Sequence, residues 1–185
     1  IGKDVETLPN QFYTVMKGGE GQNRVSNVYF QGPNEFTVND DSVFQNAPAP
    51  INNLIGHLYV DSNGVVYKLD DETNTATLAY CPPRLGETYR VPATITGGNG
   101  TSYRVTGIGE SAFVLARGLR GLDFENLSQL SSIGANAFNS LSSMAFFKSG
   151  EEVYTKVSEI VTNSSVADAG ISRGIFEGTK LYDDI

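Results

Sequence analysis

The sequence contains one cysteine, Cys81, and one histidine, His57, among its 185 residues. A lone cysteine excludes an intrachain disulfide and a thiolate-rich metal site. The chain also lacks a run of about 18 apolar residues, which excludes a membrane-spanning helix. Its N-terminus lacks the basic and then apolar pattern of a signal peptide, so if the protein is exported its signal has been removed from this sequence.

Basic residues are scarce. The 13 lysines and arginines are outnumbered by 21 aspartates and glutamates, which gives a formal net charge of −8. A chain of this charge repels polyanions, so nucleic acids and anionic membrane surfaces are poor partners for it. We expect a cationic or neutral partner. The apolar content of 39% is enough to bury one substantial core or two small ones.

Groups that could carry catalysis are few. Neither His57 nor Cys81 lies in a recognisable nucleophile motif, and a strand histidine and a partly buried thiol explain them better than a catalytic pair. The carboxylate clusters at 40–41, 70–72 and 183–184 are typical of solvated turns. Two carboxylates could hydrolyse a glycosidic bond, but the sequence does not select a pair. We therefore expect no enzyme activity, no cofactor and no metal site.

Glycine is abundant, with 20 residues, and turn-forming residues separate short apolar runs. This pattern indicates many short strands rather than long helices. In the first 52 residues it predicts strands over 11–17 and 24–31 on either side of a glycine-rich turn at 18–21. The segment Ala47–Pro50 alternates alanine and proline and marks a candidate boundary.

The chain from 57 to 106 has the pattern of an antiparallel β meander. Strands are predicted over 57–61 and 65–69, and the Asn63-Gly64 pair between them is the strongest short hairpin signal, because both residues tolerate positive φ. Further strands are predicted over the segments 75–80, 88–91 and 102–106.

The stretch Val105–Phe113, VTGIGESAF, contains the spacing G-x-G-x-x-A that is used to cradle a dinucleotide pyrophosphate. Its second half, IGESAF, recurs further along the chain as IGANAF at Ile133–Phe138, with Ser132 in the place of Gly107. A dinucleotide site requires a crossover helix and a second parallel strand after one such motif. A repeated packing pattern explains the spacing better, and its glycines are predicted to lie at turns or close backbone contacts.

Other apolar residues repeat with the same offset, the one that takes Ile108 to Ile133. Leu119 maps onto Met144, and Leu122 maps onto Phe147. The run from 119 to 133 has the spacing L-x-x-L-x-F-x-x-L-x-x-L-x-x-I, which is typical of a leucine-rich solenoid. In such an array no coil buries its own apolar residues, so equivalent positions stack on one another. We expect Leu122 to lie beside Phe147.

A third, degenerate copy of the repeat is predicted at Ile171–Phe176, where Ile and Phe are again five positions apart. It requires an insertion of about 13 residues within 149–168 relative to a constant period. The phenylalanines that end the copies, Phe113, Phe138 and Phe176, are then expected to stack.

The signature I-G-x-x-A-F at Ile108–Phe113 and Ile133–Phe138 resembles that of the BspA-like leucine-rich repeat proteins of bacterial cell surfaces. The segments Tyr89–Pro92, Tyr103–Gly109 and Gly64–Leu69 also resemble the β-rich part that often opens these proteins. The resemblance covers about residues 57 to 182. It implies a non-enzymatic surface protein that adheres to macromolecules of a host or a neighbouring cell.

The predicted fold class is mixed and β-rich, with a short leucine-rich-repeat solenoid preceded by an antiparallel β meander. We divide the chain into a β-rich segment of unknown role at 1–52, a β meander that caps the solenoid at 53–102, and about two clear repeats and one degenerate repeat at 103–185. The first segment forms a small domain of its own or adds strands to the meander.

The candidate binding site is the concave face of the solenoid sheet. In L-x-x-L-x-L the leucines point inward, and the residues between them point to the exposed face. These residues are Gly121, Asp123, Glu125, Phe146 and Lys148. The alternative is a register shifted by one residue, which would bury Phe146 and expose Phe147.

The expected function is that of an exported, non-enzymatic module at the cell surface, binding a protein or glycan partner. Two alternatives remain: a structural spacer or cap within a larger surface protein, and a hydrolase that uses carboxylates. The expected location is extracellular or on the bacterial cell surface. No nucleic-acid partner, cofactor or metal is expected.

Overall fold

The computed structural model describes residues 1, 2, 8 and 28–181. The predicted strand over 11–17, its turn at 18–21 and the acidic pair at 183–184 lie outside these residues. Residues 28–31, the described end of the strand predicted over 24–31, are not part of a strand.

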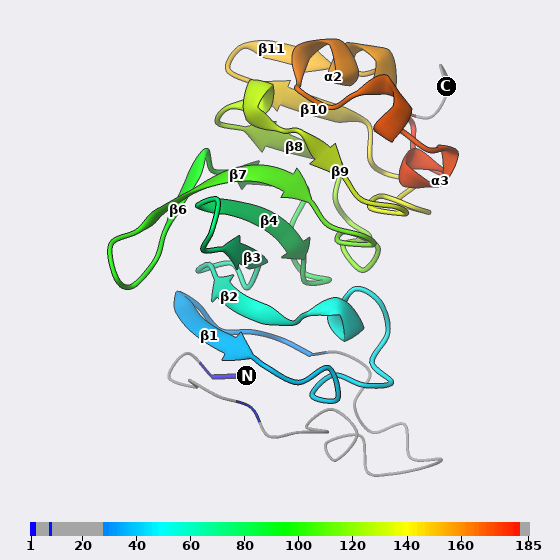
Figure 1. The fold of residues 1–185 in the computed structure, drawn as a ribbon. Coiled ribbons are helices and arrows are strands. Elements are labelled where there is room, and N and C mark those ends of the chain that lie inside the picture. Colours follow the sequence, from blue (N-terminus) through cyan, green and yellow to red (C-terminus); the bar gives the residue numbers. More distant parts are fainter. Residues whose placement is uncertain (3–7, 9–27, 182–185) are drawn as a thin grey trace.

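The described part of the chain is β-rich, with mixed sheets and few helices. Its strands are β1 (Asn34–Val38), β2 (Gly56–Val60), β3 (Val66–Asp70), β4 (Thr75–Tyr80), β5 (Thr88–Val91), β6 (Thr94–Thr96), β7 (Ser102–Ile108), β8 (Gly121–Phe124), β9 (Ser132–Ile133), β10 (Phe146–Ser149) and β11 (Glu152–Tyr154). The helices are the 3-10 turns Ile51–Asn53, Leu127–Gln129 and Asp168–Gly170, and the short helices α2 (Val157–Asn163) and α3 (Arg173–Phe176). Figure 1 shows a stack that runs from β1 and β2 at one end, through β3, β4 and β7, to β10 and β11 at the other.

The described strands form two sheets. The larger has the order β1-β2-β3-β4-β7-β6, with β9 also paired to β7, and the smaller has the order β11-β10-β8-β5. The pairs β1/β2, β2/β3 and β3/β4 are antiparallel. The hairpin predicted around Asn63-Gly64 is confirmed, with Asp61 Oδ1 accepting the amides of Asn63 and Val65 at 2.8 and 2.9 Å. Because β1 pairs antiparallel with β2, it adds a strand to the predicted meander.

The antiparallel meander predicted up to residue 106 ends at β4. Strand β7 pairs with β4 in parallel, and β5 leaves this sheet to pair in parallel with β8 in the smaller one. The predicted positions of these strands are confirmed, but their predicted antiparallel pairing is wrong. The physical reason is that the chain coils after β4, so β7 runs parallel to β4, and β5, β8 and β10 run parallel to one another. Among the described strands of the larger sheet after β4, only the short hairpin of β6 and β7 continues the antiparallel pairing. Strand patterns alone do not encode direction.

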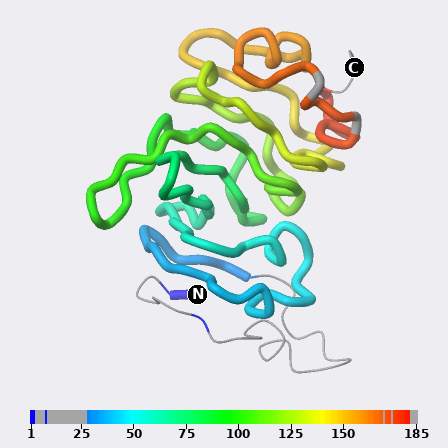
Figure 2. Tube along the Cα trace, in the orientation of Figure 1, coloured from blue at the N-terminus to red at the C-terminus, as the bar shows by residue number. Residues whose placement is uncertain are grey.

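Successive coils are joined by backbone hydrogen bonds at equivalent positions, and Figure 2 shows them following one another along the stack. The Gly109 amide donates to the Leu78 carbonyl and the Gly134 amide to the Ile108 carbonyl, both at 2.7 Å. A Cβ atom at Gly134 would lie 2.3 Å from the Glu110 nitrogen, so this glycine permits a close approach of two backbones, as predicted.

The predicted contacts between equivalent positions are present. The rings of Phe113 and Phe138 are stacked with centroids 4.9 Å apart, and those of Phe138 and Phe176 with centroids 5.3 Å apart. Leu122 is the strand partner of Phe147. The insertion predicted within 149–168 is also present, and it contains β11 and α2.

A further coil precedes the two clear repeats. Leu78 is the strand partner of Ile108, and Tyr89 is the strand partner of Leu122. Sequence comparison missed this coil because both of these pairs lie further apart in the chain than Ile108 and Ile133 do. The coil also lacks the I-G-x-x-A-F signature.

The described apolar residues form two core clusters that share a wall. One contains buried residues from 65 to 181, and the other contains buried residues from 28 to 80. Alternation along β3 explains the arrangement, because Val66 points into the second cluster and Tyr67 into the first. The boundary predicted between residues 52 and 53 falls inside the second cluster, where Phe44 and Leu58 both lie.

Candidate functional site

The outward side chains of three strands, β5, β8 and β10, and Val153 on the adjoining β11 form a surface that we name the strand face. The three strands are parallel, and their register places Thr88, Gly121 and Phe146 side by side in one row. A second row contains Arg90, Asp123 and Lys148. The intervening residues point inward, and Tyr89, Leu122 and Phe147 are all buried. Because the period of a strand is two residues, both rows face the opposite side of the sheet.

Phe147 is fully buried, whereas Phe146 is only partly buried. The structure therefore has the register that places Phe146 on the strand face, and not the alternative register shifted by one residue. Glu125, directly after β8, is exposed, and its Oε2 accepts the Ala93 amide at 2.8 Å.

Gly121 differs from the prediction because it is buried rather than exposed. The ring of Phe146 lies over it, and a Cβ atom at Gly121 would be 2.3 Å from the Cε2 and Cζ atoms of that ring. The aromatic ring therefore occupies the space that a side chain on β8 would need. Gly121 contributes to the face by admitting Phe146.

Asp123 lies at the centre of the charged row. Its Oδ2 accepts a hydrogen bond from Arg90 Nη1 at 3.0 Å, and Lys148 is its strand partner on the other side. Its Oδ1 is buried and has no hydrogen-bond partner among the described residues. The row thus alternates positive, negative and positive charge.

Two residues of this surface were missed by sequence reasoning. Arg90 was assigned to the meander, and only the parallel pairing of β5 with β8 brings it beside Asp123. Val153 on β11 is the strand partner of Lys148 and is 53% exposed, an unusual exposure for a large apolar residue. The sequence feature that could have indicated its exposure is its place within a charged segment, Glu151 to Lys156, where no strand was predicted.

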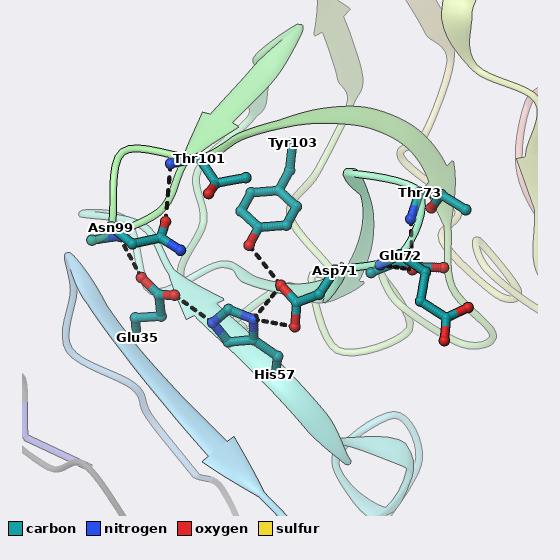
Figure 3. A network of polar contacts seen from close by, with 10 residues as sticks. Glu35, His57, Asp71, Glu72, Thr73, Asn99, Thr101 and Tyr103 are labelled. Carbon is teal, nitrogen blue, oxygen red and sulfur yellow. Dashed lines mark hydrogen bonds and ion pairs between the residues drawn. The ribbon is translucent and has the colours of Figure 1, made fainter.

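The histidine lies elsewhere, on the larger sheet, in a cluster that sequence reasoning also missed (Figure 3). His57 Nε2 contacts Glu35, and His57 Nδ1 lies 3.0 Å from both carboxylate oxygens of Asp71. The Tyr103 hydroxyl donates to Asp71 Oδ1 at 2.6 Å. Both ring nitrogens of His57 thus face carboxylates, so neither is left for Cys81.

Cys81 is fully buried in the larger core cluster. Burial, reinforced by the charge of Asp61, raises the pKa of its thiol well above the ordinary value. The thiol is therefore protonated at neutral pH and is a poor nucleophile. The sequence predicted a partly buried thiol, whereas the structure buries it fully.

An open hollow of about 610 Å³ lies beside the carboxylates predicted to be turn charges, and residues including Asp70, Asp71 and Glu72 line it. Asp70 Oδ1 accepts the amides of Glu72 and Thr73, at 2.9 and 3.1 Å, within its own turn. These hydrogen bonds lower the pKa of Asp70. Asp70 therefore stabilises the turn as an ionised acceptor, which does not suit a general acid.

Within the described residues, no group of three or more histidine, cysteine, aspartate or glutamate side chains is arranged to hold a metal ion. The same part of the chain contains no helix with the length and apolar character needed to cross a membrane.

No protein-family model matches the chain, and no curated protein matches it. Its structure is similar to that of a leucine-rich repeat protein from Bacteroides capillosus, with 28% sequence identity and a TM-score of 0.40. It is also similar to a leucine-rich cell-surface protein from Faecalibacterium prausnitzii, with 20% identity and a TM-score of 0.42. The matches cover 50% and 66% of this chain, and they span 65% and 31% of the length of the two solved chains.

Proposed function

We propose that this chain is a non-enzymatic module of the bacterial cell surface that binds a protein or glycan partner through the strand face. The observation that carries the proposal is the parallel register of β5, β8 and β10, which gathers side chains from separate coils into two outward rows. One aromatic ring, an exposed valine and a few charged groups, among them Arg90, make up this surface. Aromatic and arginine side chains are the types enriched in recognition sites.

The proposal includes a short leucine-rich-repeat solenoid preceded by a β meander. The hydrogen bonds between coils and the column of Phe113, Phe138 and Phe176 support it, since each coil contacts its neighbours at equivalent positions. The three-part division of the chain stays a prediction.

Strand β11 limits the length of the strand face at one end. It pairs antiparallel with β10 on the side away from β8, which is where a further parallel strand would have to pair. Helix α2 buries Val157 and Ile160 in the core cluster that also contains Phe147. The coil that contains Phe176 therefore extends the phenylalanine column without adding a strand beside β10.

The proposed location is extracellular or on the bacterial cell surface, and the proposed partner belongs to a host or a neighbouring cell. The net charge of −8, together with the alternating charges of Arg90, Asp123 and Lys148, favours a neutral or cationic partner over a nucleic acid. A hydrolase is disfavoured because Asp70 and Asp71, beside the hollow, already accept hydrogen bonds within the fold.

The test is a binding comparison with the double substitution Asp123→Ala and Phe146→Ala. The purified protein is applied to an array of neutral oligosaccharides and to a panel of immobilised, purified extracellular-matrix proteins. Any probe that binds the unmodified protein should lose most of its binding to the double variant, because removing one central anchor of an interface typically costs about 2 kcal/mol or more.

The matched control is Tyr29→Ala with Glu72→Ala, which removes one exposed aromatic and one exposed acid away from the strand face. This control should bind as the unmodified protein does. Equal binding by both double variants would contradict the proposed face, and the absence of any bound probe would favour the spacer alternative.

A further inference from the structure

A polar network centred on His57 links its own strand to three other segments of the larger sheet. His57 lies on β2, while its partners Glu35 and Asp71 come from β1 and from the turn between β3 and β4. Asp71 in turn accepts the hydroxyl of Tyr103 on β7, at 2.6 Å. We name these four residues the histidine clamp; Figure 3 shows the imidazole between the two carboxylates.

The clamp also holds the turn between β6 and β7. The Gly98 amide in this turn donates to Glu35 Oε2 at 2.6 Å, while Glu35 Oε1 contacts the imidazole. Glu35 is thus the link between the turn and His57. A change at the imidazole can therefore reach a segment that His57 itself does not contact.

The number of protons on the imidazole follows from its partners. A neutral imidazole has one N–H and one lone pair, whereas both nitrogens of His57 face carboxylate oxygens. A lone pair directed at a carboxylate is repulsive. Only the imidazolium, which has two N–H groups, donates to Glu35 and Asp71 at once.

The two carboxylates that face the imidazole also accept hydrogen bonds from other groups. The Tyr103 hydroxyl, with a contribution from His57, holds the pKa of Asp71 below its ordinary value. Glu35 accepts the Gly98 amide as well as His57, which suits an ionised carboxylate. The titratable groups that face the imidazole from the neighbouring elements are thus two carboxylates and, edge-on at 6.1 Å, the phenol of Tyr103.

We propose that the histidine clamp is a pH-controlled latch. Protonated His57 holds β1 and the β6–β7 turn to the rest of the sheet, and loss of its proton releases the link through Glu35 to Gly98. The latch is closed while both ring nitrogens carry protons and opens when one of them loses its proton. It lies on the larger sheet, apart from the strand face, and does not depend on the proposed function.

The direct test is NMR of the imidazole nitrogens, because the chain has a single histidine. The ring is followed from about pH 5 to about pH 9, which brackets the ordinary titration of histidine. The expected result is an imidazolium with both nitrogens protonated at the acidic end. Over the same range the hydrogen-exchange protection of Gly98 should fall by roughly tenfold or more, the effect of losing a charge-assisted hydrogen bond.

A ring that carries a proton on only one nitrogen at the acidic end would overturn the proposal. The same holds if the protection of Gly98 does not change when the ring titrates. Both measurements use the unmodified protein, so the proposal is testable even if a clamp variant fails to fold.

A second test compares His57→Gln with Glu72→Gln. Glutamine has no titrating proton, so the urea midpoint of His57→Gln should be constant over this pH range, while that of the unmodified protein falls. Glu72→Gln removes a nearby exposed carboxylate outside the clamp and should keep the fall. An equal fall in His57→Gln would overturn the proposal.

Discussion

At the residue scale, the strand face depends on a missing side chain as well as on those present. The ring of Phe146 lies against Gly121 in the space that a Cβ atom would occupy. The ring is thereby held in one place without being fully buried, and a preorganised aromatic group binds a ligand with a smaller loss of conformational entropy. Gly121 is therefore a positioning residue for Phe146.

The substitution Gly121→Ala should destabilise the protein by about 1 to 3 kcal/mol, because its Cβ atom would overlap the Phe146 ring and force it to move. Urea unfolding measures the change. The same substitution in a Phe146→Ala background should cost much less, since the overlapping ring is gone.

Gly118→Ala is the matched control, because a Cβ atom there has no neighbour within 4 Å. It should leave the stability nearly unchanged or raise it slightly. Equal losses for Gly121→Ala and Gly118→Ala would contradict the role assigned to Phe146.

Asp71 and Tyr103 place limits on stability at opposite ends of the pH scale. The hydrogen bond from Tyr103 lowers the pKa of Asp71, so this contribution to stability is present above the ordinary value of 3.8 and is lost as the pH falls through the lower, folded value. The same hydrogen bond raises the pKa of Tyr103 to about 12. This contribution is present below 10 and is lost as the pH rises through about 12.

We expect Tyr103→Phe to lower the urea midpoint at neutral pH and to remove a tyrosine that titrates near pH 12. The tyrosinate absorbance of the variant, followed against pH, should differ from that of the unmodified protein at the alkaline end of the curve. A difference centred near the ordinary value of 10 would show that the hydrogen bond to Asp71 does not shift the pKa of Tyr103.

At the element scale, the column of phenylalanines holds the coils together. Phe138 is fully buried, stacks between Phe113 and Phe176, and meets Phe147 edge-on at 5.6 Å. Together with Phe176, which meets Phe147 edge-on at 6.1 Å, it joins the phenylalanine column to the inner side of the parallel sheet.

The substitution Phe138→Ala should lower the free energy of unfolding by about 3 to 5 kcal/mol, because it leaves a cavity between two coils. Chemical denaturation measures the loss. Phe146→Ala is the matched control, since it removes the same side chain from a half-buried site and should cost clearly less. A larger loss for Phe146→Ala would contradict the assignment of these two rings.

The elements that the sequence predicts best are those whose partners lie at a constant offset. The offset shared by the two clear repeats placed Leu122 beside Phe147 and Phe113 beside Phe138, because stacked coils of equal length bring equal positions together. The coil that contains Leu78 and Tyr89 has a different length and no such offset. Its strands were located by residue type, but their partner strands were not.

The candidate site was predicted in part for the same reason. Asp123, Phe146 and Lys148 follow from the repeat offset and the two-residue period of a strand. Arg90 does not, because its place beside Asp123 depends on the parallel pairing of β5. Contacts such as those of His57 with Glu35 and Asp71 join residues 22 and 14 positions apart in different elements and leave no periodic signal.

At the scale of the whole molecule, the two core clusters are not independent. Strand β3 contributes Tyr67 to one cluster and Val66 to the other, and β4 contributes Leu78 to the first and Tyr80 to the second. Unfolding either cluster exposes one side of the same two strands. A loss of packing on one side therefore weakens the wall of the other.

Because the two clusters share β3 and β4, ligand binding at the strand face should affect the stability of the region around β1, at the other end of the molecule. Tyr89, Leu122 and Phe147 underlie that face and belong to the cluster that β3 links to Phe36 and Phe44. A ligand that binds only the folded state raises the melting temperature of every region that unfolds together with its site. Binding at the strand face should thus be detectable as delayed melting around β1, where no ligand is in contact.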